Sequence, residues 1–235
     1  MTTRPLSAAL ITIVALAGCG QPTPEQQFIN DAAAALGGRS RIEAVKTLTI
    51  EGEGVNYSLG QDVQPEAATQ TFAVTGYKRQ IDLASARQRV EQTRTPKFAY
   101  FQGPQPQTQT LGLDGEVAFN VTAAGAATRV GGLAATDRRT DLYHHPLVLV
   151  RSALSPAATV KNLRSVGTAR QADITTPAGV LTLTTNAAGQ PTSISSRAYH
   201  ANLGDVVMTT TLADYQPVNG LTLPASFAGK VDNFT

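Results

Sequence analysis

Residues 159–200 read TVKNLRSVGTARQADITTPAGVLTLTTNAAGQPTSISSRAYH, in which short runs rich in Thr, Val, Leu and Ile are separated by turn-forming residues. Runs of this kind, bounded by Gly, Pro or Asn, are typical of antiparallel strands. The stretch predicts four strands, and the pattern continues to residue 232. We expect strands and turns as follows: strands at 159–167, 170–176, 179–185, 190–200, 205–216 and 220–232, with turns at 186–189 and at Asn219-Gly220.

The first half of the chain carries the same two-residue period. Apolar and polar residues alternate over three stretches, which predicts strands with one face toward water: 46–55, 69–84 and 87–95. Gly52 and Gly54 interrupt the first stretch and predict a bulge or a bend, and Gly76 predicts a bulge in the second. Residues 111–119 predict a hairpin with Asp114-Gly115 at its turn.

A helix is expected at residues 24–36, before the first strand. Thr23 is a suitable N-cap, Pro24 a suitable first residue, and Gln26 completes a capping box. Gly37-Gly38 then ends the helix.

A second helical segment is expected at residues 136–154. Thr136 is its candidate N-cap, and Pro146 interrupts its middle. We therefore expect either a kinked helix or two successive helices.

Together these elements predict a mainly β fold with helices (α+β). The expected architecture is one curved antiparallel sheet or open half-barrel, covered by the N-terminal helix and the middle, Pro-interrupted helix. Both helices should lie on one concave face, because the apolar side of the sheet must be buried against something. Where they cover it incompletely, a hydrophobic groove would remain as a ligand site.

The amino terminus carries a second pattern, which ends in Leu16-Ala17-Gly18-Cys19. Arg4 and an apolar stretch too short to span a bilayer precede it, as in a secretory signal peptide. We expect three parts of the chain: a signal peptide over 1–18, a lipidated cysteine with a polar tether over 19–24, and a single domain over 25–235.

Small residues followed by cysteine resemble the lipobox of bacterial lipoproteins. That resemblance implies cleavage between Gly18 and Cys19, a diacylglyceryl thioether on Cys19, and acylation of the new amino terminus. Two or more acyl chains hold a protein stably at a membrane. By the same resemblance, Gly20 in place of Asp implies the outer membrane, facing the periplasm. The alternative is a soluble secreted protein whose signal peptide merely ends near a cysteine.

Composition excludes several classes of function. The chain has 235 residues, with 19 Lys and Arg against 17 Asp and Glu, for a formal charge of +2. There is no basic run of the kind that binds nucleic acid. Cys19 is the only cysteine, so no internal disulfide can form.

Residues that carry chemistry are few, and we expect no catalytic residues, metal site or cofactor. His144, His145 and His200 are the only histidines. Adjacent helical residues point about 100° apart, so His144-His145 favours helix-end packing over metal binding. Arg138-Arg139, flanked by two carboxylates, are either an anion site or a solvated helix face.

The acidic neighbours of that pair are Asp137 and Asp141. Arg138 and Asp141 have the i, i+3 spacing of a helical ion pair, whereas Asp137 and Arg139 do not. A solvated face with an Arg138–Asp141 pair is therefore the expected structural interpretation.

Four motifs occur in a familiar order: Ala35-Leu36-Gly37-Gly38 with residues 41–48; His145-Pro146-Leu147; Leu203-Gly204-Asp205-Val206; and Asp214-Tyr215 with Val218, Gly220-Leu221 and Leu223-Pro224. Together they resemble the non-catalytic N-terminal region of exported metallo-β-lactamase-fold hydrolases. That region is similar to the outer-membrane lipoprotein-sorting class of curved half-barrels. The resemblance implies an apolar groove beneath helices. It carries over no catalytic residue, because the motifs of the metal-binding domain are not in this sequence.

Three functions remain open. The first is a lipid-anchored, non-enzymatic domain that binds an apolar or amphipathic ligand. The second is an accessory domain of a metallo-β-lactamase-fold hydrolase whose zinc domain lies beyond residue 235. The third is an envelope protein that contacts a protein partner through an exposed strand edge.

Overall fold

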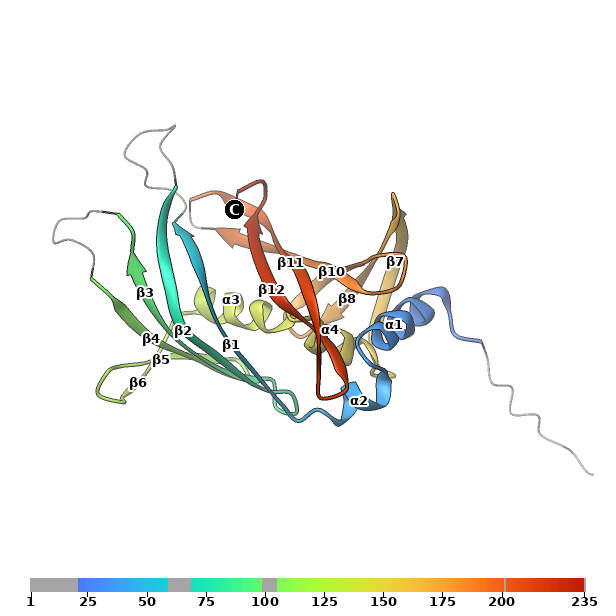
Figure 1. Ribbon diagram of the computed structural model, residues 1–235, viewed down its shortest axis with the longest axis horizontal. Helices are drawn as coiled ribbons and strands as arrows, with labels where there is room; N and C mark the ends of the chain where they lie inside the picture. Colours follow the sequence, from blue (N-terminus) through green and yellow to red (C-terminus); the bar gives the residue numbers. More distant parts are fainter. Residues whose placement is uncertain (1–20, 59–68, 99–104, 201, 235) are drawn as a thin grey trace, which may run out of the picture.

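The computed structural model describes residues 21–58, 69–98, 105–200 and 202–234 (Figure 1). The described strands form two six-stranded antiparallel sheets. The first contains β1 (Thr47–Ser58), β2 (Gln70–Asp82), β3 (Arg87–Pro96), β4 (Gln107–Asp114), β5 (Val117–Val121) and β6 (Ala127–Arg129). The second contains β7 (Thr159–Val166), β8 (Ala169–Thr176), β9 (Gly179–Thr185), β10 (Pro191–His200), β11 (Gly204–Val218) and β12 (Leu221–Val231). The predicted mainly β class with helices is confirmed.

The single curved sheet expected from the sequence is replaced by two sheets. The connection from β6 to β7 runs through α3 (Gly132–Tyr143) and α4 (Pro146–Ala153). No strand pairing joins the two sheets within the described residues. In Figure 1 the sheets lie at opposite sides of the molecule, with α3 and α4 near its centre. Alternation in a sequence reports which way a strand faces but not which sheet it joins, and this explains the error.

The N-terminal helix follows the sequence prediction closely. Helix α1 (Pro24–Ala35) is capped by Thr23, whose Oγ1 accepts from the Gln26 amide at 3.2 Å. The Thr23 amide in turn donates to Gln26 Oε1 at 2.9 Å, which completes the capping box. Gly37 ends the helix at a φ of +113°, a conformation that glycine adopts without strain.

The middle helical segment consists of two successive helices, one of the two predicted outcomes. Helix α3 begins at Gly132 with Gly131 as its N-cap, four residues before the predicted start at Thr136. The Val130 amide bonds to the Ala118 carbonyl, so the chain turns from the sheet directly into the helix. Helix α4 begins at Pro146, whose fixed φ suits the first position of a helix.

The strands of the second sheet match the predicted bounds within two residues. Between β11 and β12, Asn219 and Gly220 both have positive φ, +51° and +80°, as a tight hairpin turn requires. The bulges predicted from Gly54 and Gly76 are present as register shifts at both places. Strand β6 was not predicted, because its three exposed residues show no periodicity.

One cluster of buried apolar side chains contains residues from both sheets and from the helices. Helix α3 packs on β4 and β5 of the first sheet, whereas α1 and α4 pack on β7 and β8 of the second. Helices α1 and α4 therefore pack on the same sheet, whereas α3, the first half of the predicted middle segment, packs on the other. None of the described helices combines the length and the apolar character needed to cross a membrane.

Arg151 of α4 joins that helix to the short helix α2 (Arg39–Ala44). Arg151 Nη1 donates to the carbonyl oxygens of Ile42 at 2.8 Å, Glu43 at 2.9 Å and Val45 at 2.6 Å. These carbonyls lie at the end of α2, where the only local donor is the Val45 amide, 3.3 Å from the Ile42 carbonyl among the described residues. The guanidinium therefore stabilises both the helix end and its place in the fold.

Candidate functional site

The inner face of the first sheet is the face that carries Leu113 and Ala118 into the core. Alternate residues of a strand share a face, so four side chains of β3 lie on it: Gln88, Val90, Gln92 and Arg94. Gln92 Nε2 donates to Gln109 Oε1 on β4 at 2.9 Å. The inner face therefore changes from apolar where α3 covers it to polar toward the far end of β3.

At that far end, Arg94 lies against the ring of Phe72, which in turn packs against Phe98. Its Cζ is 4.0 Å from the centre of the Phe72 ring, which is a cation–π contact. Phe98 packs edge-on against Phe72, with ring centroids 5.3 Å apart and planes at 89°. We call Phe72, Arg94 and Phe98 the aromatic–arginine cluster. It presents a cation beside apolar surface on a sheet face that continues into the core.

The Arg94 guanidinium is incompletely satisfied. Its Nε is buried and has no hydrogen-bond partner among the described residues. Burial lowers the pKa of Arg94, because the charged form loses its contact with water. A guanidinium in this state favours an anion that can accept from it.

Between this cluster and the core, a buried network fixes α3 to the first sheet. Arg79 Nε donates to Gln88 Oε1 at 2.8 Å, and its Nη2 lies 3.0 Å from both the carbonyl oxygen and Oδ2 of Asp141. Gln88 Nε2 donates to the Arg138 carbonyl at 2.8 Å. These groups satisfy one another, so their role is structural.

The predicted arginine pair separates into two different roles. Arg138 Nη1 donates to the carbonyls of Phe119 at 2.7 Å and Gly112 at 3.1 Å, so it holds α3 against the sheet. Arg139 Nη1 instead lies 2.8 Å from Glu116 Oε1. The predicted Arg138–Asp141 pair is wrong, because each of these residues has a partner on the first sheet.

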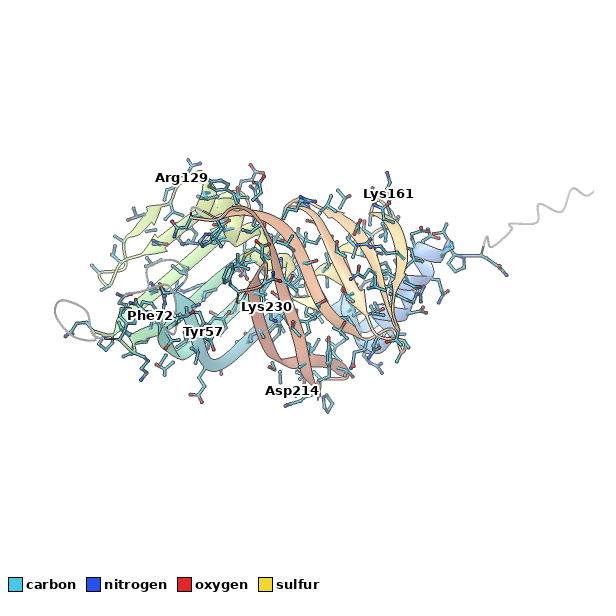
Figure 2. All side chains as sticks on the ribbon, turned by 90° about the horizontal axis from the view of Figure 1, so that it is seen from above. Tyr57, Phe72, Arg129, Lys161, Asp214 and Lys230 are labelled. Carbon is cyan, nitrogen blue, oxygen red and sulfur yellow. The ribbon has the colours of Figure 1, made fainter. Side chains whose placement is uncertain are left out.

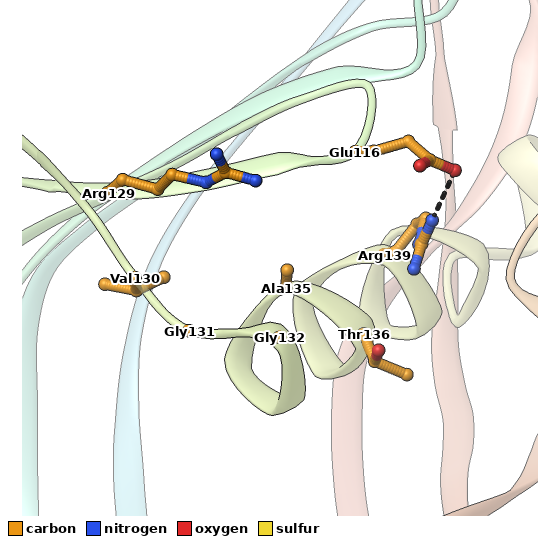
Figure 3. A pocket seen from close by; sticks show the side chains of 8 residues that line it. All are labelled: Glu116, Arg129, Val130, Gly131, Gly132, Ala135, Thr136 and Arg139. Atoms are coloured by element: carbon orange, nitrogen blue, oxygen red, sulfur yellow. Dashed lines mark hydrogen bonds and ion pairs between the residues drawn. The ribbon is translucent and has the colours of Figure 1, made fainter.

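Arg139 borders a pocket of about 560 Å³ beside the amino-terminal end of α3 (Figure 3). Figure 3 shows Arg129 and Arg139 on either side of Ala135, with Arg139 joined to Glu116. The pocket is lined by Glu116, Arg129, Val130, Gly131, Gly132, Ala135, Thr136 and Arg139.

The adjacent histidines both lie in the interior. His144 Nδ1 is 2.8 Å from Thr210 Oγ1, and its Nε2 is 2.9 Å from Ser196 Oγ. His145 caps α4 by accepting from the Leu147 amide through Nδ1 at 3.2 Å. Burial lowers the pKa of His144, and it lowers that of His145 to about 3. This packing agrees with the structural interpretation of the pair.

The remaining predicted residues contribute less. Burial raises the pKa of Asp137, and the nearby His200 partly opposes that shift. Within the part of the chain that the structure describes, no group of three or more His, Cys, Asp or Glu residues is placed to hold a metal ion. Gly18 and Cys19, the predicted cleavage and lipidation residues, lie outside the described residues.

Sequence reasoning missed the aromatic–arginine cluster. Phe72 and Arg94 are on neighbouring strands, and a bulge between Thr75 and Lys78 shifts their pairing register. The one available signal was the position of Arg94 in β3. It is separated from the buried Gln88 by an even number of residues, so both side chains lie on the inner face of a strongly polar strand.

Comparison of the chain with models of known families, with curated proteins and with solved structures found no match to any of them. The resemblance to the hydrolase-associated half-barrels therefore stays a prediction.

Proposed function

We propose that this chain is a lipid-anchored, non-enzymatic domain of the bacterial cell envelope that binds an anionic amphipathic ligand. The observation that carries the proposal is the Arg94 guanidinium, which stacks on Phe72 and whose buried Nε has no hydrogen-bond partner among the described residues. A carboxylate or phosphate headgroup would supply the missing acceptor. The apolar part of the ligand would lie along the rings of Phe72 and Phe98.

The energetics favour such a ligand over a purely apolar one. Leaving a polar group buried without a hydrogen bond costs about 1–3 kcal/mol, and more when the group is charged. An anion that reaches Arg94 would remove that cost and gain a charge-assisted hydrogen bond. An uncharged alkyl chain would gain only the area buried against Phe72 and Phe98.

The proposed anchor is the lipid on Cys19, with the domain at the outer membrane and facing the periplasm. Residues 20–22 and the capped start of α1 would then connect the lipid directly to the fold. The two sheets would act together as an open half-barrel, the finer architecture expected from the sequence, with the ligand on its concave side.

A fluorescent fatty acid tests the binding proposal. The described fold begins at residue 21, so a chain expressed from Gly20 retains all of it. We expect saturable binding of a long-chain fluorescent fatty acid and weaker binding of its uncharged methyl ester. Arg94→Gln should weaken fatty-acid binding by about tenfold or more, since a hydrogen bond to a charged group is lost. Its effect on the methyl ester should be small.

Arg89→Gln is the matched control. Arg89 lies on the same strand but faces outward, where it pairs with Glu91 at 2.7 Å. It should leave both affinities unchanged, whereas Phe72→Ala should weaken both. Absence of binding, or equal effects of the Arg94 and Arg89 variants, would contradict the proposal.

A further inference from the structure

The pocket beside α3 brings basic groups together from different elements. Arg129 ends β6, Arg139 lies in the second turn of α3, and both line the same cavity of about 560 Å³. Figure 2 shows Arg129 and Phe72 well apart on the first sheet, so this pocket is separate from the aromatic–arginine cluster. The pocket combines two guanidiniums with one carboxylate, Glu116.

Arg139 has N–H groups that make no hydrogen bond to the described residues. Its Nη1 reaches Glu116, but its Nε is buried without a hydrogen-bond partner among the described residues. The Glu116 side chain is 87% exposed, against 24% for that of Arg139. An ion pair with so exposed a partner contributes little, so Glu116 is a carboxylate that an incoming anion can displace.

The other residues that line the pocket add hydrogen-bond donors, and no second carboxylate among them would compete with an incoming anion for these donors. Arg129 makes no ion pair within the described chain. The α3 N-cap, Gly131, makes no side-chain capping bond, so the first amides of this 12-residue helix keep their hydrogen-bonding capacity. Gly131 and Gly132 leave the space next to their Cα atoms open, which allows a ligand to approach the backbone.

We propose that this pocket binds a phosphate group. Arg139 would hold it through its guanidinium N–H groups, Arg129 would neutralise its second charge, and the first amides of the helix would donate hydrogen bonds to its remaining oxygens, as they do at other helix starts. A carboxylate offers only two oxygens to this set of donors, whereas phosphate offers three or four. In the free protein, the Glu116 carboxylate occupies the position at Arg139 that two phosphate oxygens would take in the complex.

This arrangement makes an unusual prediction for Glu116. If the carboxylate competes with phosphate for Arg139, Glu116→Gln should tighten phosphate binding severalfold. Arg139→Gln should weaken it by about tenfold or more, and Arg129→Gln should weaken it to a smaller degree. A merely structural ion pair would instead give no phosphate binding in any variant.

The test is a calorimetric titration with inorganic phosphate, at constant ionic strength, of the protein expressed from Gly20. Arg87→Gln is the matched control, because it removes the same charge from an exposed pair with Asp114 on the same sheet. Thermal melting of each variant checks the fold; should Arg139→Gln fail to fold, Arg129→Gln and Glu116→Gln still decide the matter.

A second arm identifies the source of the phosphate. Glycerol phosphate in solution represents a free phosphate ester, and phosphatidylglycerol vesicles, compared with uncharged vesicles, represent a lipid headgroup. Binding in either form that depends on Arg139 supports the pocket and shows which source it accepts. Absence of binding in every form overturns the proposal. The proposal is also overturned if Glu116→Gln weakens phosphate binding, or if Arg139→Gln and Arg87→Gln weaken it equally. None of these outcomes depends on the fatty-acid experiment.

Discussion

The ring of Phe119 on β5 lies over Gly112, its direct cross-strand partner on β4. A Cβ at Gly112 would overlap the far edge of this ring, at Cζ and Cε2. The glycine is therefore required by packing and not by its backbone conformation. Aromatic cover of a strand glycine recovers part of the contact that the missing side chain would have made.

Gly112→Ala should destabilise the protein by about 1–3 kcal/mol, because the ring must move away from its present contacts. Gly229→Ala, in β12 with open space beside its Cα, should change stability by less than about 0.5 kcal/mol. Urea unfolding measures both. Combining Gly112→Ala with Phe119→Ala should cost less than the two single changes added together, since the overlap has been removed. Strict additivity would show that the ring is not the obstacle.

Stability should fall as pH falls below about 6.5, because two histidines are buried in their neutral form. Burial lowers the pKa of His145 to about 3 and also lowers that of His144, where Asp141 acts in the opposite sense. The unfolded chain then binds protons that the folded chain does not. The contribution of a histidine with a lowered pKa is complete above pH 6.5 and is lost progressively toward its folded pKa.

For His145 the loss between pH 7.5 and pH 5 should be roughly 2 kcal/mol, from about 1.4 kcal/mol per pH unit below 6.5. His145→Asn keeps a side-chain acceptor at the N-cap of α4 and removes the titrating group. Urea unfolding at the two pH values should therefore show a smaller loss in this variant. An equal loss in both proteins would place the acid sensitivity elsewhere.

Arg151→Met should destabilise the protein by roughly 2–3 kcal/mol, since three carbonyls at the end of α2 lose a charged donor while the apolar stem is kept. Arg87→Met removes an arginine from an exposed ion pair and should cost less than about 1 kcal/mol. Urea unfolding of the two variants compares them directly. Similar costs would indicate that Arg151 acts through general surface charge.

Cys19→Ser should abolish lipidation, because a hydroxyl cannot replace the thiol as the nucleophile that forms the thioether. We expect loss of fatty-acid labelling in cells and a shift of the protein out of the membrane fraction. Gly20→Asp is the control that leaves Cys19 intact, so labelling should persist. Retention of Cys19→Ser in membranes would show that something other than the lipid holds the protein there.

Local features of the fold were predictable because local chemistry determines them. Thr23 and Gln26 specify the start of α1, and Asn219-Gly220 specify a turn in which both residues need positive φ. The start of α3 was misplaced at Thr136, because a favourable capping residue occurs within a helix that begins at Gly132. The start of α3 is determined by the place where the chain leaves β6 of the first sheet.

The candidate sites were less predictable, because they depend on which residues meet across strands. Arg138 and Arg139 are adjacent in sequence, yet one binds backbone carbonyls and the other faces a pocket. Only the position of α3 on β4 and β5 separates them. Similarly, Arg94 stacks on Phe72 only after a bulge has shifted the register of β2.

The order of strands in both sheets has a consequence for how the chain reaches its structure. Each described strand pairs only with strands that precede or follow it directly in the sequence. Each pairing is therefore local in the sequence and can form at a small entropic cost before any distant segment arrives. The late steps would be those that bring α1 against β7 and the α1–α2 turn against the β11–β12 hairpin, where the Thr222 amide donates to the Leu36 carbonyl at 3.0 Å. For a chain that emerges amino terminus first, the earliest helix would be among the last elements to find its place.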